Sequence, residues 1–508
     1  MKPKQSPLFV PALWEEDHFK IVDETLLPWK VEYITVRAIP EALRAVKEMK
    51  TRAFGQVLTF LYAAALVAQG YKAKDLEPLR SRLAQLAEEF TEARPTFDFQ
   101  GLAGSYTEWF RDYPPGEEPG RWFCTKAIAF ADTIVQARNN RARLAAGILP
   151  DPCRLLTHCN ISGELVAVAE WCRQMGKEIR IVATETRPYL QGSRLTAWEL
   201  SRAGFRVALI PDCAIAQVMA KGEVNAVLVG ADRCAQNGDV INKVGTYPLA
   251  LMAKEYNVPF HALVQEPGLL AKGEDVLIEE RPVSELFAFQ SRARAPEGLK
   301  GRYPAFDLTP SSLITTLIGF DSALTPESFR QRFHQDTHAT ANSKKEGEPY
   351  LLLYGIPKRD SYAHLSHALK AEQASAVLVP EMRPALWGAR VITRELLQRK
   401  IPATLISDNM MGAFFAQGQI KRLYLFYSEL SGERLVGICG SLLAVRLART
   451  HAVPIELLSA EESQDAPPDR DVSTFLGQRV ICDRVTIYPI EKEVIPWSLL
   501  KESRAGSA

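Results

Sequence analysis

The sequence predicts an α/β protein with a mainly helical N-terminal domain, then a doubly wound parallel-sheet domain, then a second, degenerate copy of that domain. Three observations lead to this prediction. Residues 41–122 repeat apolar side chains at helical spacing, whereas from residue 154 short apolar runs alternate with helical segments of about ten or more residues. A segment of this second region then recurs closer to the C-terminal end.

Length and composition fit this architecture. The chain has 508 residues, which at roughly 150 residues per domain suggests about three domains. Hydrophobic residues make up 47% and charged residues 24%, the balance of a globular protein rather than a disordered or fibrous one. Lys and Arg number 61 and Asp and Glu 60, so the net charge gives no support for a nucleic-acid or membrane partner. A local basic pocket for a phosphate remains compatible with this charge.

The eight cysteines predict free thiols in a cytoplasmic protein. No two of them are spaced as CxxC, which disfavours a zinc ribbon or a thioredoxin motif. The N-terminal segment lacks the apolar core of a signal peptide, and the longest apolar stretch, residues 57–68, is too short to span a bilayer.

The N-terminal domain is predicted to span residues 1–145. Residues 1–40 alternate weakly between apolar and polar side chains, as in VEYITVRAI, and suggest short strands. Three later segments have the spacing of helices: EALRAVKEMK, QVLTFLYAAALVAQG and LEPLRSRLAQLAEEF.

The first parallel-sheet domain is predicted to span residues 146–334. The strand-like segments RLLTHC, RIVATE and RVALIPD each precede a helical segment, and AVLVGAD and PFHALV follow, an order typical of a doubly wound sheet. The polar segment 335–349, QDTHATANSKKEGEP, is the expected linker. The same rhythm restarts over residues 350–508 with EPYLLLYG, SAVLVPE and ATLISD.

The restart reads as a copy of the first parallel-sheet domain. Residues 184–212 align without a gap with residues 380–408, and 11 of the 29 positions are identical. Chance would give about two identities. The shared RPxLxGxR is a loop signature rather than a periodicity, so we interpret the two regions as a duplication and not merely as two sheets of one class.

Ligands of doubly wound sheets bind beyond the carboxyl ends of the strands, which directs attention to three loops of the first copy. In the first loop, Cys159 of THCN precedes a helix, whose N-terminus favours a thiolate and anions. A reactive thiol and a small buried hydrophobe both remain open for this position.

The second loop contains Arg187, Gln191 and Arg194, side chains that could hold an oxyanion. Both arginines recur at the aligned positions of the second copy, so we expect them to have a structural role. Gln191 aligns with Trp387 and is therefore not required by the fold.

The third loop carries Asp232 at the end of AVLVGAD, followed by Asn242 and Lys243. A partly buried carboxyl at this position could act as an acid or a base, and a cap for the following turn is the alternative. Asn242 and Lys243 are expected at the start of the next helix, where a lysine and the free N–H groups make a phosphate site.

Apart from the two arginines of the second loop, the second copy lacks the polar candidates. Cys159 aligns with Gly355, Asp232 with Tyr427 or Ser428, and Asn242 and Lys243 with Gly437 and Ile438. Framework positions persist while the candidate site disappears, which predicts a catalytic first copy and a non-catalytic second copy. No GxGxxG or GxxxxGK(S/T) motif occurs and His158 is the only histidine near these loops, so we expect neither a dinucleotide or P-loop site nor a metal.

The motifs at these loops resemble those of the methylthioribose-1-phosphate isomerase family. They are DETLLP, LLTHCN, ETRPYLQGSRLTAWEL, GADRCAQNGDVINKVGTY, IEER, APEG and PAFDLTP, and they cover residues 20–330. That family is related to ribose-1,5-bisphosphate isomerase and to the regulatory subunits of translation initiation factor 2B. The resemblance implies a Rossmann-like fold for the parallel-sheet domain and a cofactor-free aldose–ketose isomerase.

The resemblance also implies which residues form the site. Cys159 and Asp232 take the positions of the family's catalytic pair, and Arg52, Arg94, Gln191, Asn242 and Lys243 match its phosphate-contacting positions. Two departures lean toward the bisphosphate isomerase branch and leave the substituent at carbon 5 of the sugar open. One is the segment 52–56, RAFGQ, in place of the family's RGAPA, and the other is a shorter helix after THCN.

The expected reaction is the isomerisation of 5-methylthioribose-1-phosphate to 5-methylthioribulose-1-phosphate, a step of methionine salvage. 5-Deoxyribose-1-phosphate and ribose-1,5-bisphosphate are alternative substrates, and a non-enzymatic regulator like the initiation-factor subunits is the alternative from another class. Because members of the superfamily commonly dimerise through the Rossmann-like domain, we expect residues 350–500 to pack on the first copy as a pseudo-dimer within one chain. A homodimer and a separate regulatory ligand site are the alternatives.

Overall fold

The computed structural model describes residues 6–95, 97–289, 292–293, 296, 298–333, 347–461, 469–489 and 492–500. The chain divides into two compact units. The first comprises Met1–Ile148, Ile161–Gly176 and Phe320–Ser322, and the second comprises Leu149–Asn160, Lys177–Gly319 and Ala323–Ala508. None of the helices in the described ranges is both long and apolar enough to cross a membrane.

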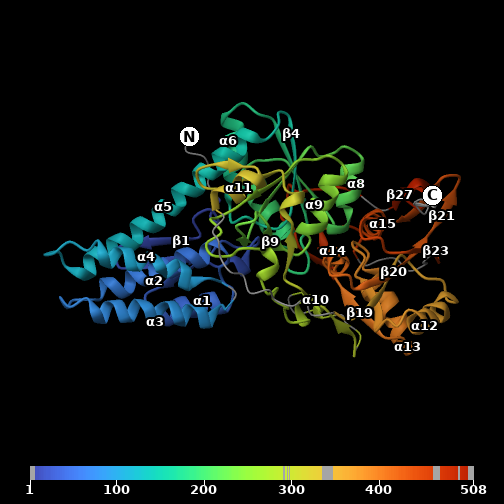
Figure 1. The fold of residues 1–508 in the computed structure, drawn as a ribbon, viewed down its shortest axis with the longest axis horizontal. Helices are drawn as coiled ribbons and strands as arrows, with labels where there is room; N and C mark the ends of the chain where they lie inside the picture. The colour runs from blue at the N-terminus through green and yellow to red at the C-terminus, as the bar shows by residue number, and fades with distance from the viewer. Residues whose placement is uncertain are drawn as a thin grey trace. The chain divides into compact units, whose positions relative to one another are not determined.

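The first unit consists of helices and a small antiparallel sheet, coloured blue to cyan in Figure 1. Its helices are α1 (Ile39–Lys47), α2 (Phe54–Gln69), α3 (Glu77–Ala93), α4 (Phe99–Arg111), α5 (Pro119–Ile148) and α6 (Glu164–Gln174), and its strands are β1 (Ala12–Glu15), β2 (His18–Val22) and β3 (Tyr33–Val36). Helix α2 is apolar on nearly all sides because it is buried, and it packs along α5. Phe60 of α2 lies among the rings of Phe90, Phe99 and Tyr106, which form the centre of this core.

Two buried arginines of α5 connect α6 to this unit. Arg138 and Arg141 donate to the carboxylate of Glu164 at 3.2 and 2.7 Å, and Arg138 also donates to the carbonyl oxygen of Phe9 at 2.8 Å. Removing one partner of such a buried ion pair would leave an uncompensated charge, so the pair fixes α6 to α5. The helical region predicted for residues 41–122 therefore extends to Ile148 and is joined by a helix from beyond the first strand of the parallel sheet.

The second unit contains two parallel sheets. In the first sheet, five neighbouring parallel strands follow the order β6-β5-β4-β7-β10. These strands are β4 (Cys153–Thr157), β5 (Ile179–Thr184), β6 (Val207–Ile210), β7 (Ala226–Gly230) and β10 (Phe260–Leu263), and the sheet continues with β15 (Thr316–Ile318) and the antiparallel β16 (Ala323–Leu324). The helices of this copy are α7 (Ala197–Arg202), α8 (Ile215–Ala220) and α9 (Thr246–Glu255). The strands are almost continuously apolar because they are buried on both faces.

The second sheet repeats this order strand by strand, as β19-β18-β17-β20-β23. Its strands are β17 (Tyr350–Tyr354), β18 (Ala376–Pro380), β19 (Ala403–Ile406), β20 (Ile420–Tyr427) and β23 (Ile455–Ser459), and its helices are α12 (Ser361–Ala371), α13 (Thr393–Gln398), α14 (Met411–Ala416) and α15 (Ser441–Thr450). The predicted fold class, helices followed by parallel α/β sheets, is thereby confirmed.

Each copy also carries a three-stranded antiparallel sheet beside its parallel sheet. In the first copy the strands are β8 (Arg233–Cys234), β9 (Val240–Lys243) and β14 (Phe306–Thr309), and in the second copy β21 (Glu429–Ser431), β22 (Arg434–Ile438) and β27 (Lys492–Pro496). Several further elements are short: α10 (Ser284–Phe287), α11 (Pro326–Phe333), β11 (Ala288–Phe289), β12 (Arg292–Ala293), β24 (Thr474–Phe475) and β25 (Gln478–Arg479).

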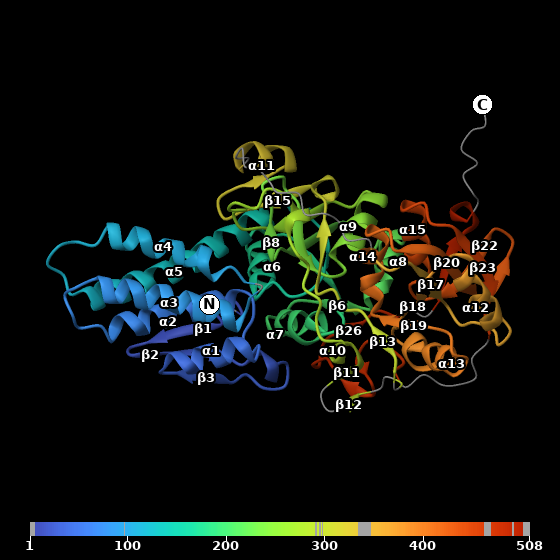
Figure 2. The ribbon, with the colours of Figure 1, turned by 60° about the horizontal axis from the view of Figure 1, so that its bottom comes forward.

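The two copies exchange short strands. Strand β13 (Lys300–Gly301), from the end of the first copy, pairs in parallel with β19 of the second sheet. Strand β26 (Thr486–Ile487), from the end of the second copy, pairs in parallel with β6 of the first sheet. Figure 2 shows both added strands beside their host strands. One edge of each sheet, at β6 and at β19, is thus covered by a short strand of the other copy, which pairs N–H and C=O groups that an open edge would present.

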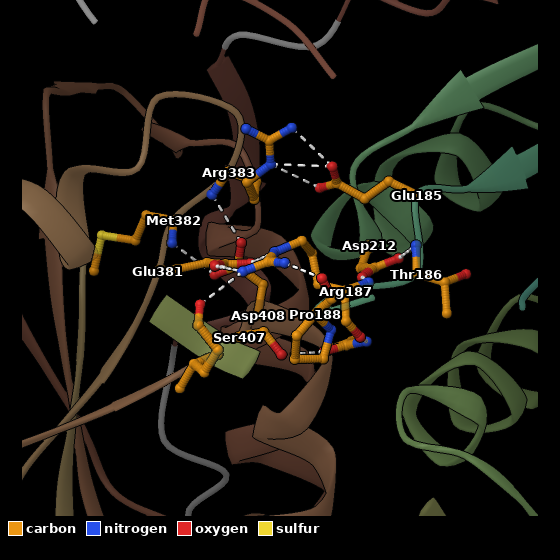
Figure 3. A network of polar contacts seen from close by, with 12 residues as sticks. Glu185, Thr186, Arg187, Pro188, Asp212, Glu381, Met382, Arg383, Ser407 and Asp408 are labelled. Atoms are coloured by element: carbon orange, nitrogen blue, oxygen red, sulfur yellow. Dashed lines mark hydrogen bonds and ion pairs between the residues drawn. The ribbon is translucent and has the colours of Figure 1, made fainter. Parts of the chain in front are cut away.

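Two buried ion pairs also join the copies reciprocally, with one arginine from each copy bound to a glutamate of the other (Figure 3). Arg187 of the first copy pairs with Glu381 of the second at 2.8 Å, and Arg383 of the second pairs with Glu185 of the first at 2.8 Å. The ring of Phe475 lies against both guanidinium groups, 3.8 and 5.2 Å from ring centroid to Cζ. These arginines hold the two copies together, in agreement with the structural role expected for Arg187.

The copies also share one apolar core, in which α8 contacts α15 and α9 contacts α14. The domain limits at residues 145, 334 and 349 stay a prediction, because the compact units group the chain by packing and join both copies. The expected linker, residues 335–349, lies outside the described residues except for its last three positions.

Candidate active site

Five of the sequence-predicted site residues belong to one edge of the first parallel sheet. Cys159 follows β4, Gln191 follows β5 and Asp232 follows β7, and these three strands are neighbours. Asn242 and Lys243 end β9 of the adjoining antiparallel sheet. Because the carboxyl ends of parallel strands meet at the same edge, the fold gathers these loops where doubly wound sheets bind their ligands.

Cys159 has a backbone conformation that non-glycine residues rarely adopt. Its φ is 68°, in the left-handed region, and the aligned residue of the second copy is Gly355 with a φ of 95°. Two hydroxyl groups hold this conformation: the Cys159 N–H donates to Thr186 Oγ1 at 2.9 Å, and Thr196 Oγ1 donates to the Cys159 carbonyl at 2.7 Å. Strained residues that the surroundings hold in place cluster at functional sites. Glycine would adopt this backbone conformation at a lower free-energy cost. The cysteine at this position is therefore a candidate for a chemical role rather than a packing role.

The polar side chains around Cys159 are lost in the second copy, as Cys159 itself is. Thr186, Thr196 and Asn160 align with Met382, Ile392 and Ile356. Asn160 Nδ2 donates to Thr196 Oγ1 at 3.0 Å, so it braces one of the two hydroxyl groups. Reasoning from the sequence missed these three residues. The gapless alignment of the two copies could have found Thr186 and Thr196, because each replaces an apolar side chain with a hydrogen-bonding one.

His158 has a structural role that the second copy retains with another side chain. Its Nε2 lies 2.9 Å from the carbonyl oxygen of Val244 and its Nδ1 lies 2.7 Å from Thr184 Oγ1. Burial lowers the pKa of His158 to about 4, so the ring is neutral at pH 7. In the second copy the hydroxyl group of Tyr354 donates at 2.8 Å to the corresponding carbonyl, that of Cys439. Among the described residues, no group of three His, Cys, Asp or Glu side chains is placed to hold a metal ion.

Gln191 is buried, with 9% of its surface exposed, and among the described residues its Oε1 has no hydrogen-bond partner. Leaving a buried polar atom unsatisfied costs roughly 1–3 kcal/mol, so such an atom calls for an explanation. A polar ligand at this edge of the sheet would supply the missing partner. The aligned Trp387 has no comparable amide.

Asp232 is exposed, not partly buried as the sequence led us to expect. It lies in the turn between β7 and β8, where its N–H donates to the carbonyl of Ile241 at 2.9 Å and its carbonyl accepts from Gln265 Nε2 at 2.7 Å. The backbone is thus anchored on both sides while the residue remains accessible. The expectation of burial failed because the strand ends two residues earlier, at Gly230.

Asn242 and Lys243 lie on a strand, whereas the sequence suggested the start of a helix. Helix α9 begins three residues later, and the carboxylate of Asp307 already accepts the N–H groups of Gly245 at 2.7 Å and Tyr247 at 3.1 Å. Burial raises the pKa of Asp307 to about 8. Two amides at this helix N-terminus are therefore occupied by a carboxyl group, and a phosphate at this position would depend on the Lys243 side chain instead.

The side chains of Asn242 and Lys243 are fixed by neighbouring groups. Asn242 Nδ2 donates to Thr246 Oγ1 at 3.0 Å, and Lys243 Nζ lies 4.6 Å from the centroid of the Phe306 ring. A cation over an aromatic face is held without neutralising its charge. Lys243 thus remains a positive group beside the loops that carry Cys159 and Asp232 in the same unit.

Arg52 and Arg94 belong to the other unit. Arg52 lies between α1 and α2, where its N–H donates to Glu24 Oε1 at 2.9 Å, and Arg94 follows the last residue of α3, where its N–H donates to the carbonyl of Phe90 at 2.9 Å. Both side chains are half-buried. Their contact with a phosphate stays a prediction.

The profile of the initiation factor 2 subunit family matches residues 55–321 and 339–423. The chain belongs to the initiation factor 2 subunit family. Among its relatives in this family, the methylthioribose-1-phosphate isomerase of Desulforudis audaxviator is 36% identical over 335 residues, which cover 62% of this chain and 93% of the relative. The methylthioribose-1-phosphate isomerase of Thermotoga neapolitana is 33% identical over 325 residues, 62% of this chain and 94% of the relative.

Two solved structures extend the comparison within the initiation factor 2 subunit family. The 5-methylthioribose 1-phosphate isomerase from Pyrococcus horikoshii OT3 gives a TM-score of 0.58 at 30% identity, over 65% of this chain and 98% of that structure. The translation initiation factor eIF-2B subunit delta from A. fulgidus gives 0.53 at 33% identity, over 62% of this chain and 96% of that structure. These relatives are matched almost whole, so roughly a third of this family member has no counterpart in them.

Proposed function

We propose that this chain is a cofactor-free aldose–ketose isomerase of a ribose-1-phosphate derivative, with 5-methylthioribose-1-phosphate as the substrate and methionine salvage as its setting. The observation that carries the proposal is the strained backbone of Cys159, held by Thr186 and Thr196 where the second copy has glycine and apolar residues. The relatives that are named methylthioribose-1-phosphate isomerases support it independently.

The chemistry of the substrate sets the task of the site. A phosphate ester at C1 locks the aldose as a ring, so the reaction cannot begin from a free aldehyde. Asp232 acts as the general acid that delivers a proton to the ring oxygen as the bond from C1 to that oxygen breaks. The hydrogen on C2 then moves to C1, while the hydroxyl group on C2 loses its proton and becomes the ketone. The proton gained by the ring oxygen and the proton lost from that hydroxyl group balance.

Cys159 acts on the hydrogen that moves between C2 and C1. It either relays this hydrogen as a proton or shields a direct hydride shift from water. The unsatisfied amide oxygen of Gln191 accepts a hydrogen bond from a substrate hydroxyl group, and Lys243 contacts the phosphate together with Asn242.

A direct assay tests this proposal. The substrates to compare are 5-methylthioribose-1-phosphate, 5-deoxyribose-1-phosphate and ribose-1,5-bisphosphate, because the segment 52–56 leaves the substituent at carbon 5 open. We expect Cys159→Ala and Asp232→Asn each to lower kcat by about a thousandfold or more while the far-UV spectrum stays unchanged. Near-normal turnover in either variant would overturn the assignment of that residue. Running the reaction in deuterium oxide separates the routes, since full retention of the substrate hydrogen excludes Cys159 as a base that exchanges with water.

The similarity to an initiation-factor subunit supports one other candidate, a non-enzymatic regulator. A regulator would not need a cysteine in the left-handed region, braced by side chains that the second copy has lost. No turnover of any of the three sugar phosphates by the intact chain would favour the regulator.

We further propose that residues 350–500 take the place of a partner subunit, so that one chain is a pseudo-dimer. The exchanged strands and the two reciprocal ion pairs support this proposal, because each of these contacts of the first copy with the second is matched by its converse. A two-fold interface has this self-complementary character.

A further inference from the structure

One side chain of the second copy reaches the loop of the first copy that carries Lys243. Asn409, which is buried, donates through Nδ2 to the carbonyl oxygens of Val244 at 3.1 Å and Arg187 at 2.9 Å. Its Oδ1 accepts from Ser407 Oγ at 2.6 Å. Because carbonyl oxygens only accept hydrogen bonds, the two contacts fix the orientation of this amide. Val244 directly follows Lys243, so the second copy holds the backbone next to the proposed phosphate-binding residue.

A chain of hydrogen bonds continues from that carbonyl to Cys159. The carbonyl oxygen of Val244 also accepts from His158 Nε2, which leaves Nδ1 to accept from Thr184. Thr184 Oγ1 lies 3.2 Å from Thr186 Oγ1, and Thr186 Oγ1 accepts the N–H of Cys159. Each member is buried or half-buried, so water does not easily replace a broken link.

The reciprocal position shows that the fold does not require an amide here. Asn409 aligns with Cys213 of the first copy, whose Sγ lies 3.8 Å from the carbonyl of Arg383 and 3.5 Å from Cys439 Sγ. Cys213 therefore occupies the position equivalent to Asn409, but it contacts a loop of the second copy. In the second copy Gly355 stands where the first copy has Cys159. The amide is present only on the side that faces the candidate active site.

Both side chains are packed equally closely against the opposite copy. A Cβ atom on Gly245 would lie 2.9 Å from the Cβ of Asn409, and a Cβ atom on Gly440 would lie 2.7 Å from the Cβ of Cys213. Both glycines also have a positive φ, 106° and 92°. Asn409 and Cys213 thus form a matched pair. They differ in hydrogen bonding but pack equally closely against the other copy.

We propose that Asn409 is a positioning residue for the active site of the first copy, through which the second copy completes that site. It fixes the carbonyl of Val244, and through it the Lys243 loop and the backbone of Cys159. The kinetic part of this inference rests on the proposed isomerase function, whereas the link to Cys159 does not depend on any substrate.

The test compares Asn409→Ala and Asn409→Cys with the matched control Cys213→Ala in the full chain. We expect both Asn409 variants to lower kcat by about tenfold to a hundredfold with KM changed less than about threefold, because the reacting groups are displaced rather than removed. Cys213→Ala is expected to keep the kcat of the unmodified chain. Asn409→Cys serves where Asn409→Ala does not fold, since the interface already accommodates a cysteine at the reciprocal position.

Hydrogen exchange supplies the readout that needs no substrate. In both Asn409 variants we expect the amide of Cys159, followed by mass spectrometry of peptides that cover residues 155–160, to exchange at least about tenfold faster. Cys213→Ala should leave this rate unchanged at an equal or larger loss of thermal stability. If Asn409 and Cys213 variants have the same kcat and the same exchange rate, the inference is overturned. If exchange responds but no sugar phosphate turns over even in the unmodified chain, the proposed function fails and the link from Asn409 to Cys159 stands.

Discussion

Cys159 combines backbone strain with a thiol. The aligned residue of the second copy, Gly355, has neither. The left-handed conformation costs a residue with a Cβ atom about 1 kcal/mol relative to glycine. Gly355 avoids this cost at a φ of 95°, whereas Cys159 is held at 68° by the hydroxyl groups of Thr186 and Thr196. Stability and chemistry are therefore in conflict at this residue, which is common at active sites.

Two substitutions of Cys159 separate these contributions. We expect Cys159→Gly to be more stable than Cys159→Ala by about 1 kcal/mol, because alanine keeps the strain and glycine relieves it. Neither variant should turn over substrate. Chemical denaturation of both variants measures the difference, and an alanine variant as stable as the glycine variant would show that the backbone at position 159 is not strained.

At the residue scale, the sequence predicts where a residue lies in the fold better than it predicts the exposure and contacts of its side chain. The loop after a parallel strand correctly indicated where Cys159 lies in the fold, whereas the separation of Gln191 from the framework stays a prediction. The exposure of Asp232 could not be predicted, because it depends on where β7 ends and on how the β8–β9 hairpin folds back. Nor could the contacts of Thr186 and Thr196, which join segments that are distant along the chain.

At the scale of elements, helices α9 and α15 are a natural pair for experiment. The carboxyl group of Asp307 accepts two amides at the N-terminus of α9, and Glu493 accepts the N–H of Leu442 at 2.7 Å at the N-terminus of α15. Burial raises the pKa of both acids, to about 8 and about 7. Both copies retain the acid, so its first role is to anchor the helix.

Of the two helices, only α9 follows a strand with predicted site residues. Loss of its acid should therefore affect activity, whereas loss of the acid at α15 should not. Asp307→Ala and Glu493→Ala should each lower the free energy of unfolding by about 2 kcal/mol, because buried amides lose their acceptors. Asp307→Ala should also lower kcat/KM by about tenfold or more, since Asp307 pairs with Asn242 across β14 and β9. Glu493→Ala should leave kcat/KM unchanged. Equal effects of the two variants on activity would mean that the α9 anchor does not position Lys243.

The order of strands and helices followed from the sequence more closely than their packing did. Periodicity indicated the parallel strands and most of the helices, because buried strands of this type are apolar throughout. It wrongly placed Asn242 and Lys243 at a helix start, since a four-residue strand before a helix leaves no clear period. It also could not indicate that α6 packs with α5, which depends on the buried pairs of Arg138 and Arg141 with Glu164.

At the scale of the whole chain, the two copies of the duplicated domain are joined by exchanged strands and reciprocal ion pairs. A repeat in the sequence indicates that two domains are alike, but it does not indicate that β13 and β26 cross to the opposite sheets or that Arg187 and Arg383 each bind the other copy's glutamate. These contacts join residues far apart in sequence and follow only from the packed structure. They cover one edge of each parallel sheet and bury the charges of both ion pairs.

The pseudo-dimer makes a prediction about molecular mass. We expect the full chain to behave as a single species of 56.6 kDa in light scattering, because its own second copy occupies the interface. A chain truncated after residue 335 would expose the edge of β6, leave Arg187 without Glu381 and uncover part of the shared apolar core. We expect it to self-associate for these reasons. The truncated chain should therefore have a different oligomeric state from the full chain at equal molar concentration. The same state for both, whether monomer or dimer, would show that residues 350–500 do not replace a partner subunit.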